Sequence, residues 1–371
     1  MNILYFAPIY YFDMKQRPQQ IAELLSENHR VYYIEPTISA VRQLIKGGER
    51  SCKGEQIFIN PNLTVIRLNG LLTFHKSVEI LDFLGINNLS EFLQIRKLVQ
   101  KCDVLWVGYS GWYTLVRHIK NKPVVFDKMD EEDMLVPSKL LKKTLQRNKK
   151  KMVGLANTII VTCQKFYDEL SVTGKPVFLI SNAVSDRFME NVLKENDCDE
   201  IGQIENVNRI GYIGTIGEWF DMDVVDELLS LNKTCKIVLV GRNYLLMNKN
   251  PRVIYLGVRD NSELPEIIKT FDICLYNFKK SELLDTINPV KIYEYLSANK
   301  PVLAVRSAET VRLKNYLMLY DDKNDIRKYL AQDIKKPFAN ENERIEFIKG
   351  NSWRVRTQEI NSILSRLGEK T

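Results

Sequence analysis

Short apolar runs separated by polar loops recur along the whole chain. Several runs are four or five residues long and rich in Val and Ile, and they lie at residues 104–107, 158–162, 209–213, 237–240 and 302–305. Continuous apolar runs of this length predict parallel strands that are buried on both faces. Between them, segments such as Gln19 to Leu25 and Ser90 to Val99 place apolar residues at helical spacing. The alternation predicts an α/β protein with parallel sheets.

The length of 371 residues is too great for one hydrophobic core and suits two α/β domains. An acidic, poorly patterned stretch divides the strand-rich segments into two series. Such a stretch is typical of an interdomain linker. We therefore expect a first domain over residues 1–184, a linker over 185–208, a second domain over 209–345 and a final helical segment over 346–371.

The segment TINPVKIYEYLSANKPV, residues 286–302, predicts a loop, a helix and a strand in succession. Pro289 suits a first helical turn, and the helix is expected over Val290 to Ser297. Lys291 and Glu294 stand three residues apart on one face of that helix. A cation there can bind phosphate, and a carboxylate can accept hydrogen bonds from sugar hydroxyls. The alternative is an ordinary surface ion pair.

This segment resembles the C-terminal signature of GT-B glycosyltransferases of the family 4 type, usually P-x-K-x-x-E-Y-x-A-x-G-K-P-V. The matching residues are Pro289, Lys291, Glu294, Tyr295, Ala298, Lys300, Pro301 and Val302. Asn299 replaces the usual glycine and tolerates the left-handed conformation of a helix end. Thr286 stands where many members carry the first glutamate of an E-x7-E pair. The resemblance implies that Glu294 binds the ribose of the donor, without the usual glutamate at the donor sugar.

The resemblance also implies a GT-B fold, in which two Rossmann-like, doubly wound domains face each other across a cleft. The first domain would bind the acceptor, the second the nucleotide sugar, and the last helix would cross back to the first domain. A partial hinge motif at residues 182–184, a glycine turn after the strand at 209–213 and a basic residue after the strand at 237–240 agree with it. The implied donor-binding residues are Gly214, Thr215, Arg242, Asn288, Lys291 and Glu294.

Five carboxylates follow the strand predicted at Val124 to Phe126, and they are Asp127, Asp130, Glu131, Glu132 and Asp133. Mutual repulsion and partial burial raise the pKa of one member of such a cluster, as a general base requires. The spacing D-x-x-D-E resembles the same point in related transferases, so Asp127 and Asp130 are the candidate catalytic residues. Helix capping is the alternative role for them.

Two further residues are candidates on the acceptor side. Arg17 precedes the first helix, and Tyr109 follows the strand at 104–107. Both positions belong to the carboxyl ends of strands, where ligands bind in doubly wound sheets. Arg17 has an equally plausible structural role, in which it neutralises a helix or a neighbouring carboxylate.

Residues 139–151 predict a basic helix with an apolar stripe, which can bind an anionic lipid surface. The candidate membrane-facing residues are Lys142, Lys143, Lys149 and Lys150; a solvated helix face is the alternative. The net charge of +7 favours anionic partners. Because no nucleic-acid-binding motif is present, no nucleic acid partner is expected.

Hydrophobic residues make up 45% of the chain and charged residues 27%, and no apolar run is long enough to cross a bilayer. The N-terminus reads as a first strand, so we expect a cytoplasmic protein at the inner face of the plasma membrane. The six cysteines form no C-x-x-C pair, and Asp221-Met222-Asp223 is interpreted as a helix N-cap. No metal and no cofactor are expected beyond a UDP- or GDP-sugar as co-substrate.

The resulting hypothesis is a nucleotide-sugar-dependent glycosyltransferase, of hexosyltransferase type. Because the chain also resembles bacterial surface-polysaccharide enzymes of the capsule, teichuronic acid and xanthan type, the expected acceptor is lipid-linked or a polysaccharide. Fold analogy does not fix the substrate, however. Two alternatives stay open: a nucleotide-sugar epimerase of the same fold, and a non-catalytic GT-B partner protein, which the departure at Thr286 makes plausible.

Overall fold

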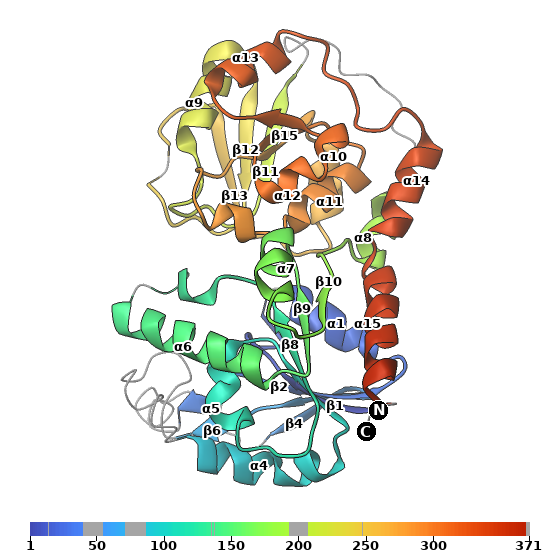
Figure 1. Ribbon diagram of the computed structural model, residues 1–371. Helices are drawn as coiled ribbons and strands as arrows, with labels where there is room; N and C mark the ends of the chain where they lie inside the picture. The colour runs from blue at the N-terminus through green and yellow to red at the C-terminus, as the bar shows by residue number, and fades with distance from the viewer. Residues whose placement is uncertain are drawn as a thin grey trace. The chain divides into compact units, whose positions relative to one another are not determined.

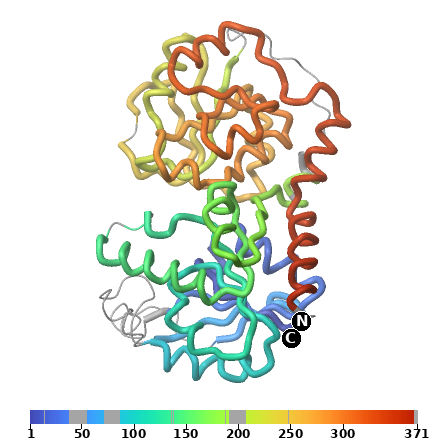
Figure 2. The backbone as a smooth tube through the Cα atoms, viewed as in Figure 1, coloured from blue at the N-terminus to red at the C-terminus, as the bar shows by residue number. Residues whose placement is uncertain are grey.

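The computed structural model describes residues 1–13, 15–39, 55–70, 87–134, 136, 138–192, 207–246 and 248–368. The chain divides into two compact units (Figures 1 and 2). Unit 1 comprises Met1–Ser181 and Thr357–Thr371, and unit 2 comprises Asn182–Arg356. The chain therefore returns to unit 1 inside its last helix, α15 (Trp353–Gly368).

Unit 1 is built on an eight-stranded sheet of order β10-β9-β8-β7-β1-β2-β5-β4. Its strands are β1 (Asn2–Phe6), β2 (Arg30–Ile34), β4 (Gln56–Asn60), β5 (Leu63–Ile66), β7 (Val104–Val107), β8 (Val124–Lys128), β9 (Thr158–Val161) and β10 (Val177–Leu179). Only β4 runs antiparallel to its neighbour. Two further strands, β3 (Ile38–Ser39) and β6 (Asn69–Gly70), form a separate parallel sheet. The strand order reverses between β1 and β7, which is where doubly wound sheets bind ligands.

Helices cover the unit 1 sheet, and apolar side chains fill the space between (Figure 1). They are α1 (Arg17–Leu25), α4 (Asn88–Lys101), α5 (Tyr113–Val116), α6 (Lys139–Leu155) and α7 (Gln164–Ser171), with 3-10 turns η1 (Ser110–Trp112) and η2 (Glu132–Met134). Alternate residues of β1 serve opposite faces: Phe6 joins the core with Trp112, while Tyr5 stacks between Tyr33 and Trp106. Both faces are thus buried, as the continuous apolar runs predict.

Unit 2 has a six-stranded, all-parallel sheet of order β13-β12-β11-β14-β15-β16. Its strands are β11 (Arg209–Ile213), β12 (Lys236–Val240), β13 (Val253–Gly257), β14 (Ile273–Tyr276), β15 (Val302–Val305) and β16 (Met318–Tyr320). Its helices are α8 (Asp186–Val192), α9 (Met222–Leu231), α10 (Leu264–Lys269), α11 (Val290–Ser297), α12 (Ala308–Val311), α13 (Lys323–Leu330) and α14 (Glu341–Gly350), with 3-10 turns η4 (Leu284–Thr286) and η5 (Lys314–Tyr316). Here the order reverses between β11 and β14.

Several predicted elements match the structure at both ends, among them β7, β11, α11 and β15. The helix expected from Ser90 begins two residues earlier: α4 starts at Asn88, and the Ser90 hydroxyl donates to Asn69 O at 3.1 Å. Strand β8 continues to Lys128, so Asp127 lies in the strand and not after it.

The stretch expected to be a linker begins with a helix, α8, whose Phe188 is buried in the core of unit 2. A short helix with few apolar positions carries too weak a period to be recognised in an acidic segment. Residues 193–206, together with Cys52 and Cys198, lie outside the described residues. The cysteines that the structure describes, Cys102, Cys163, Cys235 and Cys274, are buried free thiols.

None of the helices in the described part of the chain combines the length and the apolar character needed to span a bilayer.

Candidate functional site

The loop that follows β11 is fixed to the loop that follows β12. Gly214 N donates to Val240 O at 2.9 Å, and Ile216 N donates to Arg242 O at 2.8 Å. Gly241 has φ +135°, and a Cβ on it would lie 2.1 Å from Gly214 O. Only glycine permits this conformation and this approach. The two loops therefore form one rigid backbone surface at the carboxyl edge of the unit 2 sheet.

The same loop is also fixed on its other side, to the chain that follows β14. Asp221 N donates to Asn277 O at 2.8 Å, and Lys279 N donates to Trp219 O at 2.7 Å. The side chain of Asn277, fully buried, donates to Asp221 O at 2.9 Å. The predicted donor residues Gly214 and Thr215 thus belong to a clamped loop at the point where the strand order reverses. We call residues 214–221 the glycine loop.

Helix α11 is attached to the end of β11 by a buried tyrosine. The hydroxyl of Tyr295 accepts a hydrogen bond from Ile213 N at 2.8 Å, and its side chain is fully buried. The motif match included Tyr295 but gave it no role. Since Ile213 immediately precedes the glycine loop, this bond fixes α11 relative to that loop. Asn299, which ends the helix, has φ +52°, and this confirms its predicted left-handed conformation.

Lys291 Nζ lies 2.7 Å from Glu294 Oε2, so the two residues form an i,i+3 ion pair. Such a pair was the alternative to a donor site that the sequence left open. Their side chains are 28% and 14% exposed, so both groups still reach solvent. Arg242 lies exposed at the carboxyl end of β12. The three charged candidates therefore occupy the carboxyl side of the unit 2 sheet, and their roles toward a donor stay predictions.

Asn288 is engaged inside the protein. It is 5% exposed; its Nδ2 donates to Glu309 Oε2 at 2.7 Å, and its Oδ1 accepts from Asn182 N at 2.8 Å. This geometry anchors the start of unit 2 to the loop before α11. Thr286 is also buried, and its hydroxyl donates to Leu283 O at 2.7 Å.

In unit 1, two predicted site residues bind each other. Arg17 Nη2 lies 3.0 Å from Asp127 Oδ1, and Arg17 Nε lies 3.2 Å from both carboxylate oxygens. The remaining nitrogen, Nη1, donates to Ile180 O at 2.8 Å. Arg17 is 5% exposed and Asp127 is fully buried. The pair joins α1, β8 and the chain after β10, which is the structural role that the sequence left open for Arg17.

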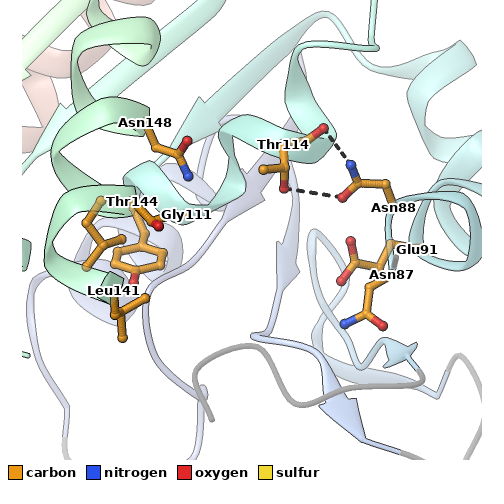
Figure 3. A pocket seen from close by; sticks show the side chains of 10 residues that line it. Asn87, Asn88, Glu91, Gly111, Thr114, Leu141, Thr144 and Asn148 are labelled. Atoms are coloured by element: carbon orange, nitrogen blue, oxygen red, sulfur yellow. Dashed lines mark hydrogen bonds between the residues drawn. The ribbon is translucent and has the colours of Figure 1, made fainter. Parts of the chain in front are cut away.

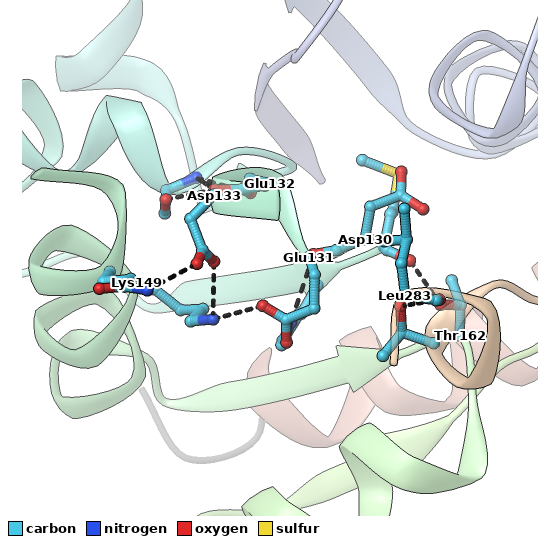
Figure 4. Close-up of polar contacts among 12 residues, drawn as sticks. Asp130, Glu131, Glu132, Asp133, Lys149, Thr162 and Leu283 are labelled. Atoms are coloured by element: carbon cyan, nitrogen blue, oxygen red, sulfur yellow. Dashed lines mark hydrogen bonds and ion pairs between the residues drawn. The ribbon is translucent and has the colours of Figure 1, made fainter. Parts of the chain in front are cut away.

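Three of the other four carboxylates after β8 are held by side-chain contacts, as Figure 4 shows. Glu131 pairs with Lys128 at 2.9 Å and with Lys149 at 2.5 Å. Asp133 pairs with Lys149 at 3.1 Å. These contacts tie the loop after β8 to helix α6.

Glu132 is held separately, by the start of η1. Its carboxylate accepts from Ser110 N at 3.0 Å and from the Ser110 hydroxyl. By contrast, the Asp130 carboxylate forms no hydrogen bond or ion pair with a described residue, and Asp130 is exposed. Asp130 is thus the carboxylate of this cluster left available to a ligand by the described part of the chain.

The protein surroundings raise the pKa of two of these carboxyl groups, those of Asp130 and Glu132. The pKa of the Asp130 carboxyl is raised, mainly because nearby protein atoms displace solvent; the charges of Lys128 and Arg17 oppose this, and those of Asp127 and Glu131 add to it. Burial raises the pKa of Glu132 to about 7, against the hydrogen bonds from Ser110 that lower it. A raised carboxyl pKa suits proton transfer near neutral pH.

Lys128 was not among the predicted residues. It is 3% exposed, its Nζ lies 3.4 Å from the centre of the Phe166 ring, and it donates to Asp130 O at 3.2 Å. Desolvation lowers the pKa of its ammonium group. The signal in the sequence is a lysine directly between two candidate acids, in Asp127-Lys128-Met129-Asp130. Lys128 fixes the backbone from which the Asp130 side chain projects.

Helix α6 confirms the predicted basic helix and extends it to Leu155, with Ser138 as its N-cap. Lys143 and Lys150 are exposed and Lys142 is half-buried, whereas Lys149 is used in the ion pairs with Glu131 and Asp133. Leu140 is 45% exposed beside them. Tyr109 is 7% exposed and lines a pocket between α4 and α6 (Figure 3).

Among the residues that the structure describes, no group of three or more His, Cys, Asp or Glu side chains is arranged to hold a metal ion. Asp221 caps α9, as predicted, by accepting from Asp223 N at 3.0 Å.

Comparison with solved structures gives matches over the whole chain. Sucrose-phosphate synthase from Thermosynechococcus elongatus matches with a TM-score of 0.70 at 14% identity, covering 100% of both chains. Trehalose 6-phosphate synthase from Burkholderia multivorans matches with 0.68 at 10% identity, covering 100% of this chain and 98% of the other. Anabaena HepE in complex with UDP and glucose matches with 0.63 at 15% identity, covering 98% and 99%.

These matches define the class: the chain has the GT-B fold of glycosyltransferases, which confirms the predicted α/β fold. No family model matches the chain. One similar curated protein is TuaH of Bacillus subtilis (strain 168), named as a teichuronic acid biosynthesis glycosyltransferase, with 24% identity over 170 residues. That match covers 44% of this chain and 42% of TuaH, so it spans less than half of either protein.

Proposed function

We propose that this protein is a glycosyltransferase that moves a sugar from a nucleotide-sugar donor to a lipid-linked or polysaccharide acceptor of a bacterial cell surface. The observation that carries the proposal is the glycine loop, clamped between its two neighbouring strand ends, with α11 attached to it through Tyr295. Such a loop presents rigid backbone to a pyrophosphate. The partial similarity to TuaH supports the surface-polysaccharide acceptor.

In this proposal the donor nucleotide binds unit 2. Glu294 accepts hydrogen bonds from the ribose hydroxyls, which requires its ion pair with Lys291 to open or be shared. Lys291 and Arg242 neutralise the diphosphate, whose charge grows as it leaves. Arginine suits this role because its planar fork binds two phosphate oxygens at once. The HepE complexes contain UDP or UDP-glucose, and we propose a UDP-sugar as the first donor to test.

Asp130 is the proposed acceptor-side base, if the reaction inverts the anomeric centre. It is exposed, makes no hydrogen bond with a described residue, and has a raised carboxyl pKa. These properties suit a group that takes a proton from an acceptor hydroxyl. Asp127 acts here only as a positioning residue, since it is buried against Arg17.

The test is incubation with radiolabelled UDP- and GDP-sugars, with and without a bacterial membrane lipid extract. Transfer of label into lipid or polysaccharide supports the proposal. Formation of an epimer of the donor supports the epimerase alternative, and neither product, with nucleotide still bound, supports a non-catalytic partner.

Glu294→Gln tests the donor site within the same assay. A hydrogen bond to a charged group contributes about 1.5–3 kcal/mol, so the variant should bind UDP more weakly, by about tenfold or more. Glu282→Gln is the control, because Glu282 is exposed in unit 2 and lies before η4. Equal UDP affinity in Glu294→Gln and the control would remove Glu294 from the donor site.

We also propose that α6 holds the enzyme on an anionic membrane, at the inner face of the plasma membrane. Its cations Lys143 and Lys150 are exposed, and so is the apolar side chain of Leu140 in its first turn. Each cation near an anionic surface contributes about 1 kcal/mol. Lys143→Glu/Lys150→Glu should release the protein from vesicles containing phosphatidylglycerol; Lys323→Glu/Lys328→Glu in α13, with the same net charge, should not. Equal sedimentation of both variants would contradict the role.

A further inference from the structure

Trp219, in the glycine loop, exposes an aromatic surface that none of the roles proposed above explains. The chain has four tryptophans. Trp106 and Trp112 are fully buried and Trp353 is 3% exposed, whereas Trp219 is 38% exposed. Leaving part of an indole in water forfeits the free energy of burying it. The exposed ring of Trp219 therefore suits a ligand that covers it when bound.

The indole is held in one orientation by the loop itself. Its Nε1 donates to Thr215 O at 3.3 Å, and its ring lies against Gly217, where an added Cβ would be 2.7–2.8 Å from three ring carbons. Gly217 does not have a positive φ, so the ring and not the backbone conformation excludes a side chain there. A ring fixed in advance loses little conformational entropy when a ligand stacks on it.

The two halves of the glycine loop offer different chemistry. Residues 214–217 carry no charged side chain, and the N–H groups of Thr215 and Gly217 form no hydrogen bond with a described residue. Free backbone donors suit a diphosphate. The next residues, Glu218 and Trp219, present an exposed carboxylate and the exposed indole. A carboxylate repels a diphosphate but accepts hydrogen bonds from sugar hydroxyls, so the second half of the loop suits a sugar.

A nucleotide sugar carries a sugar on each side of its diphosphate, the ribose and the transferred sugar. Glu294 is the proposed ligand of the ribose. Thr286, where the resemblance would place a contact to the transferred sugar, is 1% exposed, and its hydroxyl donates to Leu283 O. The transferred sugar is therefore without a side-chain contact among the residues proposed so far.

We propose that Trp219 stacks on the apolar face of the transferred sugar and fixes its orientation beside the diphosphate. A pyranose presents C–H groups on the faces of its ring, and the negative face of an indole attracts their partial positive charge. The ligand class is thus a pyranose with an apolar face, joined to a nucleoside diphosphate. This inference rests on the proposed function, because it needs a nucleotide sugar in unit 2.

Calorimetry with the full chain tests it by comparing UDP with UDP-glucose, UDP-galactose, UDP-N-acetylglucosamine and UDP-glucuronate. Trp219→Ala should weaken binding of the tightest of these UDP-sugars by at least about fivefold, and binding of UDP by less than about twofold. An equal loss for both ligands would assign the ring to the nucleotide and overturn the proposal. Unchanged binding of both, or a wild type that binds UDP and none of the UDP-sugars, would overturn it too.

Two further variants separate stacking from support of the loop. Trp219→Phe keeps an aromatic face without the hydrogen bond to Thr215 O, so it should retain most of the UDP-sugar affinity; a loss as large as in Trp219→Ala contradicts stacking. Gly217→Ala displaces the ring and should weaken the UDP-sugar more than UDP, which gives the answer if Trp219→Ala fails to fold. Leu231→Ala is the control, because Leu231 is 37% exposed but ends α9, on the chain that leads to the start of β12.

Fluorescence reports on the ring in the unaltered protein. Because the other three tryptophans are buried, acrylamide should quench chiefly Trp219. A bound UDP-sugar should protect this fluorescence, and UDP should protect it less; equal quenching with and without the UDP-sugar contradicts stacking. Sugar transfer by a protein whose Trp219 stays unprotected contradicts this inference alone. No binding of UDP or of any UDP-sugar contradicts the proposed function, and this inference with it.

Discussion

The two units carry sheets of the same winding, yet they hold the loops at their carboxyl edges by different means. In unit 2, the glycine loop is fixed by backbone hydrogen bonds to the chain after β12 and after β14. In unit 1, the loop after β8 is fixed by its carboxylate side chains, which bind Lys128, Lys149 and Ser110. The glycine loop therefore depends on backbone conformations that glycine allows, whereas the loop after β8 depends on ion pairs and on the protonation of its carboxylates.

The difference bears on what each edge can do. Fixed backbone groups suit a ligand part that never varies, such as a diphosphate. Paired side chains leave one acid, Asp130, outside the network of described contacts, and desolvation raises the pKa of its carboxyl group. The comparison therefore predicts that substitutions in the two loops have different effects on stability, turnover and UDP binding.

The largest effect is expected from Asp127→Ala. It leaves the Arg17 guanidinium buried without its carboxylate, and breaking a buried pair costs about 3–5 kcal/mol of unfolding free energy. Urea denaturation measures the loss. Asp130→Ala is the control, and it should change stability little because Asp130 is exposed. Equal stability of the two variants would mean that the ion pair between Arg17 and Asp127 contributes little to holding α1 against β8.

The second prediction concerns catalytic activity, for which we expect Asp130 to matter more than Asp127. Asp130→Asn should fold normally and bind UDP normally, but turnover should fall at least a hundredfold, within the range of about 10²–10⁴ for general acid–base catalysis. Steady-state transfer assays and calorimetry with UDP provide the measurements. Near-normal turnover with a lower melting temperature would instead assign Asp130 a structural role.

The third prediction concerns the contact between the glycine loop and the chain after β12. Gly241→Ala should cost about 2 kcal/mol or more and weaken UDP binding, because its Cβ would meet Gly214 O. Gly257→Ala is a matched control, since Gly257 also has positive φ, +71°, but no atom lies within 4 Å of its added Cβ. It should cost only about 1–2 kcal/mol, from the conformation alone. Equal losses would show that the close approach of the two loops is unimportant.

The smallest effect tests the dependence of unit 1 on protonation. The folded-state pKa of Glu132, about 7, lies above the ordinary value of 4.5, so the folded protein holds this proton more tightly than the unfolded chain does. Its stabilising effect is complete below about pH 4.5 and is lost as the pH rises through about 7. Melting temperatures of wild type and Glu132→Gln should diverge over that range, with the wild type falling more. Parallel curves would contradict the raised pKa.

The sequence by itself determined the α/β class, the ends of β7, β11, β15 and α11, and the identity of the GT-B fold. These features have local causes. A strand buried on both faces must be continuously apolar, and a helix ends where Pro301 follows and Asn299 adopts positive φ. The end of a regular element is therefore written in adjacent residues.

Only the tertiary structure decided which candidate side chains are already engaged. Arg17 and Asp127 stand 110 residues apart, and their pairing depends on the fold bringing the start of α1 to the end of β8. A side chain's role depends on its partners in space, and those partners come from distant segments. Sequence pattern therefore located the acids and the basic helix, but the fold decided which of them remain available to a ligand.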